Sequence, residues 1–234
     1  MDRPTIVAIG GGSCGQEPEN RALDDYLLGL TGKEHPRVCC IPTAEGDSAI
    51  ALVRFYSAYT SDRCAPSHLA LFHRTVRDLR AFLLSQDMIF VGGGNTAAML
   101  AIWRQHGVDA ILREAWERCS LLCGVSAGAN CWFEACSTDS FGLIDALNDG
   151  LGFLPGSFCP HYDGEERRRP TLQEFVTGGR LADGWAADNH AALRFEATNL
   201  VETVASKPHA RGYRVSKTAT GGFEEHELET RLLV

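Results

Sequence analysis

The 234-residue sequence contains no apolar run that approaches the roughly 18 residues needed to span a bilayer. Its first residues also lack the basic and then apolar pattern of a secretory signal. Hydrophobic residues make up 44% of the chain and charged residues 22%, both near the averages of globular proteins. We therefore expect a soluble, cytoplasmic protein with no membrane partner.

Basic clusters and metal-binding spacings are also missing. The net charge is −8, and no run of Lys or Arg is longer than three residues, at 167–169, so the chain lacks the basic surface that a nucleic acid needs. The nine cysteines form no C-x-x-C pair, and no H-E-x-x-H occurs. Most cysteines lie in apolar runs, which is typical of buried thiols in a reducing compartment. We expect neither a metal nor another cofactor.

Short apolar segments rich in β-branched residues alternate with amphipathic segments of helix length. Such alternation predicts an α/β protein with a mostly parallel sheet and helices on both faces, and the length fits a single domain over residues 1–234. The predicted strands are Thr5–Ile9, Arg37–Ile41, His68–Phe72, Met88–Val91 and Leu121–Val125, and the predicted helices are Arg21–Leu30, Ser48–Tyr59, Val76–Ser85, Thr96–His106 and Val108–Arg118.

The C-terminal part has a different character. Ala191–Glu196, Leu200–Ala205 and Gly212–Ser216 are short predicted strands separated by turns, which favours an antiparallel extension or edge. Residues 137–165 are rich in Gly, Ser, Pro and Asp, and we expect them to form a long irregular segment.

One motif in the chain carries chemistry. Residues 124–130, Gly-Val-Ser-Ala-Gly-Ala-Asn, follow an apolar strand and fit the G-x-S-x-G nucleophile elbow. A sharp strand-to-helix turn needs small neighbours, which Gly124 and Gly128 provide, and it lifts the Ser126 hydroxyl above the sheet. The N–H of Ala127 would then point at developing negative charge. The alternative is a simple turn in which Ser126 only caps the helix.

A second glycine cluster, at residues 92–94, follows the strand Met88–Val91 and is followed by Asn95 and Thr96. It could be only a tight turn with a helix cap. It also lies at the carboxyl edge of a neighbouring strand, where open α/β sheets bind ligands. We therefore predict Gly94 as the second oxyanion donor and Asn95 as a substrate contact.

A histidine has to accept the serine proton. Of the eight histidines, His161 is the best candidate, because it falls in an irregular stretch downstream of Ser126. Asp139 lies between the two, so that the order nucleophile, acid, histidine matches that of α/β-hydrolases. Asp139 could instead make a local turn.

The glycine cluster at 92–94, the elbow at 124–130 and Pro160-His161 together resemble peptidase E and its relative cyanophycinase. The resemblance covers about residues 5–195. It implies a fold similar to class I glutamine amidotransferases, which is flavodoxin-like, and a serine dipeptidase that prefers an N-terminal Asp. It further implies Ser126 as nucleophile and His161 as base. Asp139 would complete the triad, with Glu134 as a rival because cyanophycinase-like relatives use Glu.

In peptidase E an arginine beyond the histidine recognises the aspartyl side chain. Arg167 aligns best with it and Arg168 is second, and a guanidinium pairs bidentately with a carboxylate. The same run could be only a solvated, charged helix start before Thr171–Val176. The expected partner is thus a small peptide, and a homodimer is possible. Cleavage of other amides, or a non-catalytic binding module on the same scaffold, stay open as alternatives.

Two further sequence features suggest other functions, namely a dinucleotide-binding pattern and a cysteine near the elbow. Residues 10–15 satisfy G-x-G-x-x-G, but no helix opens at once and the next strand is not followed by an acidic residue. We expect this loop to border the active site rather than to bind a dinucleotide. Cys123 precedes Ser126 by three residues within a strand, which places it on the opposite face, so we predict a core thiol.

Overall fold

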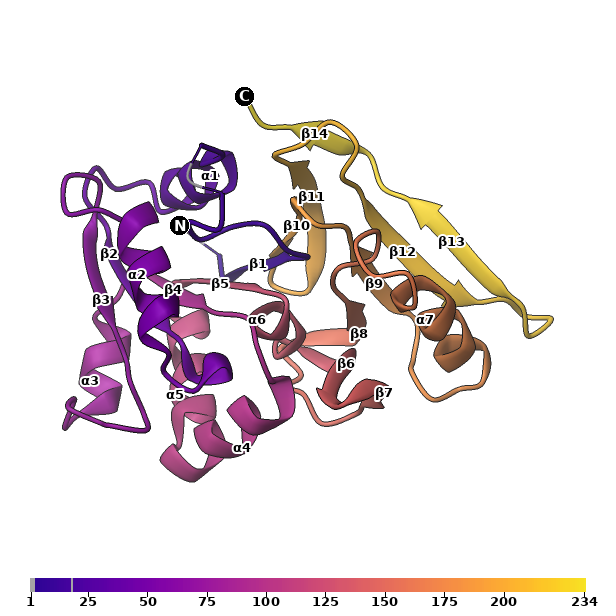
Figure 1. The fold of residues 1–234 in the computed structure, drawn as a ribbon, viewed down its shortest axis with the longest axis horizontal. Coiled ribbons are helices and arrows are strands. Elements are labelled where there is room, and N and C mark those ends of the chain that lie inside the picture. Colours follow the sequence, from indigo (N-terminus) through magenta and orange to yellow (C-terminus); the bar gives the residue numbers. More distant parts are fainter. Residues whose placement is uncertain (1–2, 18) are drawn as a thin grey trace.

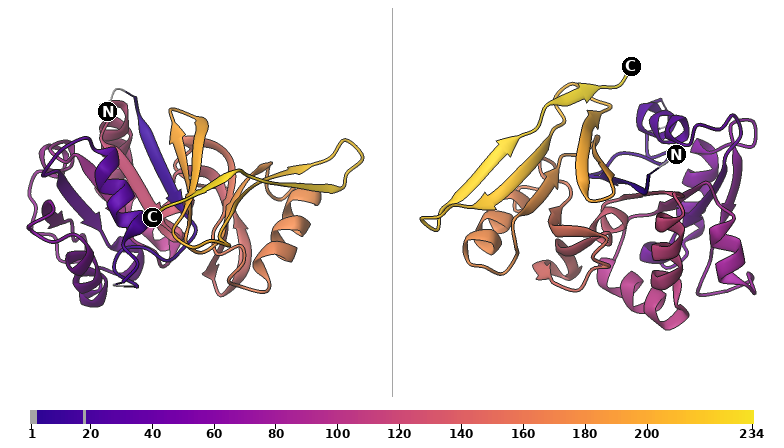
Figure 2. Two further views of the ribbon diagram at one scale, coloured as in Figure 1. Left: turned by 90° about the horizontal axis from the view of Figure 1, so that it is seen from above. Right: turned by 180° about the vertical axis from the view of Figure 1, so that it is seen from behind.

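The computed structural model describes residues 3–17 and 19–234, so Met1, Asp2 and Pro18 lie outside the described part of the chain. Figure 1 shows two halves. The first, mostly in indigo to magenta, holds an eight-stranded sheet with helices around it, and three strands of that sheet come from the orange to yellow C-terminal part. The second, in rose to yellow, holds a six-stranded sheet and one helix. Seen from above, the turn at residues 218–222 forms the outer tip of the second half (Figure 2).

The eight-stranded sheet has the order β14-β11-β10-β1-β5-β4-β2-β3. Its strands β1, β5, β4, β2 and β3 are parallel, and β10 joins β1 antiparallel. The predicted mostly parallel sheet is therefore confirmed. The bounds are β1 (Thr5–Ile9), β2 (Arg37–Ile41), β3 (Ala65–His68), β4 (Met88–Val91), β5 (Leu121–Val125), β10 (Ala191–Glu196), β11 (Asn199–Ala205) and β14 (Thr230–Leu232).

Helices cover both faces of this sheet, as predicted. Alternate residues of each strand face opposite sides: Ile6 and Ala8 of β1 join the core under α3, α4 and α5, whereas Val7 and Ile9 join the core under α1 and α2. The helices are α1 (Ala22–Leu30), the 3₁₀ turn η1 (Thr43–Glu45), α2 (Ala49–Ala58), α3 (Leu79–Leu84), α4 (Thr96–His106), α5 (Val108–Glu117), α6 (Ala127–Asn130) and α7 (Arg168–Thr177).

A second, six-stranded sheet has the order β13-β12-β9-β8-β6-β7. Helix α7 packs on it through Leu172, Phe175 and Val176. Its strands are β6 (Phe133–Phe141), β7 (Leu143–Leu147), β8 (Leu154–Cys159), β9 (Gly184–Ala187), β12 (Gly212–Lys217) and β13 (Phe223–Glu227).

The expectation of an irregular segment over residues 137–165 is wrong, because much of it forms β6, β7 and β8. Its Gly, Ser and Asp residues suit this position, since β7 is an edge strand whose residues stay partly or largely exposed. The antiparallel C-terminal extension is confirmed only in part. Strands β10 and β11 complete the first sheet, whereas β12 belongs to the second.

The strand predicted at His68–Phe72 lies earlier in the chain, at Ala65–His68. Beyond it, the Leu71 and Phe72 N–H groups donate to the Asp47 carboxylate instead of to a strand. Helix α3 also starts later than predicted, because the Asp78 side chain accepts the Ala81 N–H and caps it there.

Candidate active site

Ser126 lies at a strained turn between β5 and α6. Its φ of 55° and ψ of −114° are unusual for a residue with a side chain. The turn leaves no room for larger neighbours: a Cβ on Gly124 would lie 2.2 Å from the Gly128 carbonyl oxygen, and one on Gly128 would lie 2.2 Å from the Val91 oxygen. These contacts agree with the geometry expected of a nucleophile elbow.

The Ser126 side chain does not cap the helix. No hydrogen bond joins its hydroxyl to the α6 backbone, and its Oγ lies 2.8 Å from His161 Nε2. Cys123, in contrast, is fully buried among the side chains under α1 and α2, and burial raises the pKa of its thiol well above the usual range. The prediction of a core thiol at Cys123 is confirmed.

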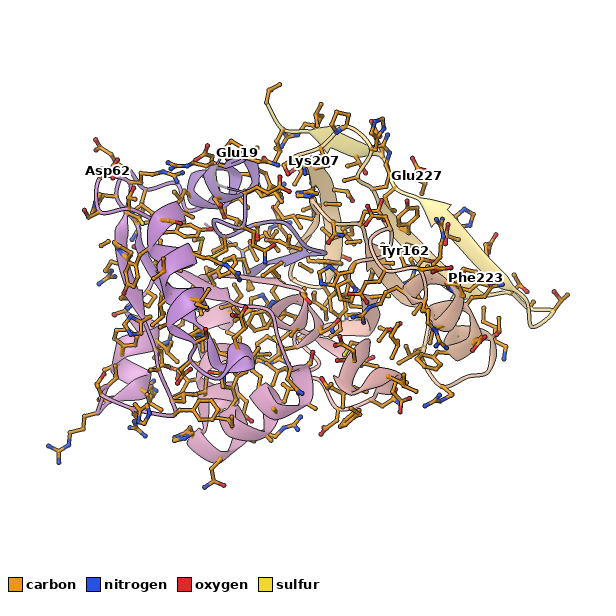
Figure 3. The ribbon with its side chains drawn as sticks, viewed as in Figure 1. Glu19, Asp62, Tyr162, Lys207, Phe223 and Glu227 are labelled. Atoms are coloured by element: carbon orange, nitrogen blue, oxygen red, sulfur yellow. The ribbon has the colours of Figure 1, made fainter. Side chains whose placement is uncertain are left out.

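His161 follows β8 and approaches Ser126 from the second half of the molecule. Its backbone N–H donates to the Gly10 carbonyl oxygen, and its own carbonyl accepts the N–H of Gly164. The next residue, Tyr162, is labelled in Figure 3 beside the C-terminal strands, where its hydroxyl donates to Glu225 over 2.6 Å. These contacts tie the histidine to both halves of the fold.

The second ring nitrogen of His161 contacts an amide rather than a carboxylate. His161 Nδ1 lies 2.7 Å from Asn189 Oδ1. Asn189 sits between β9 and β10, at the junction of the two sheets. Asn189 was not among the predicted site residues, because β9 was not among the predicted strands. The available signal was the polar group Asp188-Asn189-His190 directly before a predicted strand.

The structure places the two predicted acids away from His161. Asp139 is largely exposed on β6 and forms an ion pair of 3.6 Å with Arg168. Glu134 accepts the backbone N–H of Gly156 over 2.8 Å. Neither hydrogen-bonds to the histidine, so the prediction that one of them orients His161 has to be corrected. The chain order that suggested Asp139 does not place its side chain near the ring.

Arg167 and Arg168 differ sharply. Arg168 is buried, and its guanidinium is engaged by Glu165, by Asp139 and by the Ser137 carbonyl oxygen. It is therefore a structural residue. Arg167 is exposed and lines a surface hollow of about 770 Å³ together with Asp139 and Glu165.

Within the glycine cluster at 92–94, Gly93 lies beside Ser126. A Cβ on Gly93 would lie 3.5 Å from Ser126 Cβ, whereas one on Gly94 would meet the Ala44 carbonyl oxygen at 2.3 Å. Asn95 caps α4 through the Ala98 N–H, and its amide nitrogen donates to the Ser140 oxygen. Both ends of the Asn95 side chain thus serve the fold, and its predicted contact with substrate stays a prediction.

A recess of about 380 Å³, open to solvent, lies beside the elbow. Gly93 and Val125 form part of its wall, and Cys14 and Cys40 contribute thiols whose pKa burial raises well above the usual range, so that both are uncharged. The exposed Arg54 of α2 also lines it.

The loop at residues 10–12 borders the site, as expected. A Cβ on Gly11 would lie 2.0 Å from Asn189 Oδ1 and 2.8 Å from His161 Nδ1. Within residues 3–17 and 19–234, no group of three or more His, Cys, Asp or Glu side chains is placed to hold a metal ion. No helix of the same residues is long and apolar enough to cross a bilayer.

Comparisons with known proteins show the family and the fold of the chain. Residues 6–203 match the family model of peptidase family S51. The chain is 47% identical over 223 residues to the uncharacterized peptidase YgaJ of Bacillus subtilis. The aligned region covers 95% of this chain and 94% of that relative. It is 33% identical to peptidase E of Citrobacter koseri over 46% of this chain and 48% of that protein. A solved peptidase from an acI-B1 actinobacterium shares the fold, with a TM-score of 0.68, 16% identity, and coverage of 97% of this chain and 95% of that one.

Proposed function

The chain belongs to peptidase family S51, and we propose that it hydrolyses short peptides through an acyl-enzyme formed on Ser126. The observation that carries the proposal is the 2.8 Å contact between Ser126 Oγ and His161 Nε2 at a strained elbow. A serine hydroxyl is a weak nucleophile until a base accepts its proton, and a neutral imidazole nitrogen within hydrogen-bond reach can act as that base.

The reaction would proceed in two halves. Ser126 Oγ attacks the scissile carbonyl carbon while His161 Nε2 takes the hydroxyl proton. The tetrahedral intermediate then breaks its C–N bond, and His161 gives the proton to the leaving amine. In the second half a water molecule attacks the ester, its proton passes to His161, and Ser126 recovers the proton as the acid product leaves.

The oxyanion of each tetrahedral intermediate needs preorganised donors. The Ala127 N–H is the first candidate, because it directly follows the nucleophile at the start of α6. The loop at 92–94 supplies the second. Gly94 is the donor expected from the sequence, and Gly93 is the neighbour whose position is closest to Ser126.

We propose a preference for dipeptides with an N-terminal Asp, on the basis of the similarity to peptidase E proteins and of Arg167. Arg167 is exposed beyond His161, and no hydrogen bond or ion pair of the described residues occupies its guanidinium. A carboxylate can therefore pair with it.

The test is hydrolysis of Asp-Leu, Glu-Leu, Asn-Leu and Ala-Leu by the wild type, by Ser126→Ala and by Ser61→Ala. Ser61 is exposed and its hydroxyl has no role in the site, so Ser61→Ala is the matched control. We expect Asp-Leu to be cleaved best, and only by the wild type and the control. Full activity in Ser126→Ala would exclude the mechanism.

A second set of substrates separates the remaining alternatives. Cleavage of β-linked aspartyl peptides in place of the dipeptides would indicate a cyanophycinase-like amide hydrolase. A wild type that cleaves nothing and is not labelled by a fluorophosphonate would indicate a non-catalytic binding module.

A further inference from the structure

His161 is held between two oxygen atoms. Ser126 Oγ lies 2.8 Å from its Nε2, and Asn189 Oδ1 lies 2.7 Å from its Nδ1. An amide oxygen can only accept a hydrogen bond, so Nδ1 must carry the ring proton. A neutral imidazole then has a free lone pair on Nε2, which is where the Ser126 proton has to go. The contact with Asn189 thus selects the tautomer that catalysis requires.

Asn189 itself has little freedom to move. Its backbone N–H donates to Asp163 Oδ1 over 2.7 Å. Its side chain lies between two glycines: a Cβ on Gly11 would be 2.0 Å from Oδ1, and a Cβ on Gly164 would be 2.0 Å from Nδ2. Any larger residue at either position would displace the amide. A side chain fixed in this way can hold a ring in one orientation.

Charged groups surround the pair without bonding to the ring. Asp163 accepts the Asn189 backbone N–H. Asp188 accepts the Arg211 N–H and the Tyr213 hydroxyl. The His190 ring lies against Gly12 and faces Glu17 and Lys207. None of the hydrogen bonds of the described residues joins a carboxylate to His161.

We propose that Asn189 is the positioning residue of this enzyme, and that the Ser-His pair works with a neutral third member in place of a carboxylate. The proposal rests on the serine mechanism proposed above. It adds a functional consequence. A carboxylate beside the ring would favour the imidazolium, which cannot accept the serine proton. With an amide there, His161 stays competent as a base to lower pH than it would in a Ser-His-carboxylate arrangement.

The experiment compares Asn189→Ala, Asn189→Asp and Asn199→Asp with the wild type. Asn199 is an exposed residue of β11, so Asn199→Asp controls for the added charge. Two quantities are followed across pH 4.5–9: kcat/KM for the best dipeptide, and the rate at which a fluorophosphonate labels Ser126. The second readout does not depend on which peptide is the substrate.

We expect Asn189→Ala to reduce the labelling rate and kcat by roughly 10²-fold with little change in KM, because ring orientation is lost. We expect Asn189→Asp to keep more activity than Asn189→Ala, and to move the acidic limb of both profiles up by about one pH unit. Asn199→Asp should leave both profiles in place. Thermal unfolding of each variant shows whether it is folded.

Two results would overturn the proposal. One is Asn189→Ala within twofold of the wild type in labelling rate, and the other is a folded Asn189→Asp whose acidic limb does not move. Should Asn189→Asp fail to fold, Gly164→Ala tests Asn189 sterically, because the three atoms nearest to a Cβ there all belong to Asn189. Labelling at the wild-type rate in that variant would count against the proposal. If Ser126→Ala also remains active, the serine mechanism fails as well; if Ser126→Ala is inactive, only the role of Asn189 falls.

Discussion

The two sheets contribute to the site in different ways. The eight-stranded sheet supplies Ser126 and the adjacent N–H groups from turns at the ends of β4 and β5, each built within a few residues of chain. The six-stranded sheet supplies His161 from the end of β8, and Asn189 lies where the chain passes from the second sheet back to the first. The turn that carries the proposed nucleophile is thus built locally, whereas the positions of His161 and Asn189 depend on how the two sheets meet.

The largest expected effect comes from a change in the turn between β5 and α6, which the eight-stranded sheet provides. Ser126→Ala should lower kcat by at least about 10³-fold, because no other hydroxyl replaces the attacking oxygen. Its fold should persist, since the side chain does not cap the helix and, among the described residues, hydrogen-bonds only to His161. The measurement is kcat on Asp-Leu beside circular dichroism, with Ser61→Ala as control. A Ser126→Ala protein as active as the control would remove the elbow from the mechanism.

The next effect tests the junction between the sheets. Gly11→Ala adds a Cβ 2.0 Å from Asn189 Oδ1, so we expect roughly a 10²-fold loss in kcat from a displaced His161. Gly29→Ala is the matched control, because a Cβ at Gly29 meets nothing within 4 Å and alanine favours its helix by about 1 kcal/mol. Equal activity in the two variants would mean that the packing of Gly11 against Asn189 does not fix the position of the His161 ring.

A smaller effect distinguishes the two places where a substrate carboxylate could bind. If Arg167 pairs with the aspartyl side chain, Arg167→Gln should raise KM for Asp-Leu roughly ten- to hundredfold and leave Ala-Leu nearly unchanged. Arg54→Gln, in the recess beside Gly93, is the comparison. A selective loss in Arg54→Gln instead would move aspartyl recognition from the second half of the molecule to the first.

The smallest effect concerns stability at the same junction. Burial raises the pKa of Asp188 to about 6 from its ordinary 3.8. A carboxyl with a raised pKa in the folded state contributes stability below about pH 4 that is lost as the pH rises through 6. Asp188→Asn should therefore raise the free energy of unfolding by about 1 kcal/mol at pH 7.5 and by nearly nothing at pH 4.

Urea unfolding at the two pH values measures this difference. Glu34→Gln, at an exposed carboxylate, should give no gain at either. A gain at Asp188 that does not depend on pH would mean that the buried charge is not its cause.

The parallel strands and the turn at Ser126 could be predicted because each is indicated by a few consecutive residues, an apolar segment or the G-x-S-x-G motif. Strands β1, β2, β4 and β5 lie where their apolar segments predicted them, and so does helix α4. The second sheet was not predicted, because β6 contains several Ser, Thr and Asp residues, β7 is a half-exposed edge strand, and β9 has only four residues. Without β9, the polar group Asp188-Asn189-His190 was the one sequence signal for Asn189, and it did not indicate a contact with His161.

The sequence by itself indicated Ser126 as the candidate nucleophile, because the small residues Gly124 and Gly128 flank it directly after an apolar strand. It also indicated His161, which the structure brings to the serine hydroxyl. Only the tertiary structure decided the third group: Asp139 precedes His161 in the chain but pairs with Arg168, whereas Asn189 reaches the ring. The physical reason is that the hydrogen bond between His161 and Asn189 depends on how closely the chain segments after β8 and β9 lie in space. The order of residues along the chain does not fix that distance.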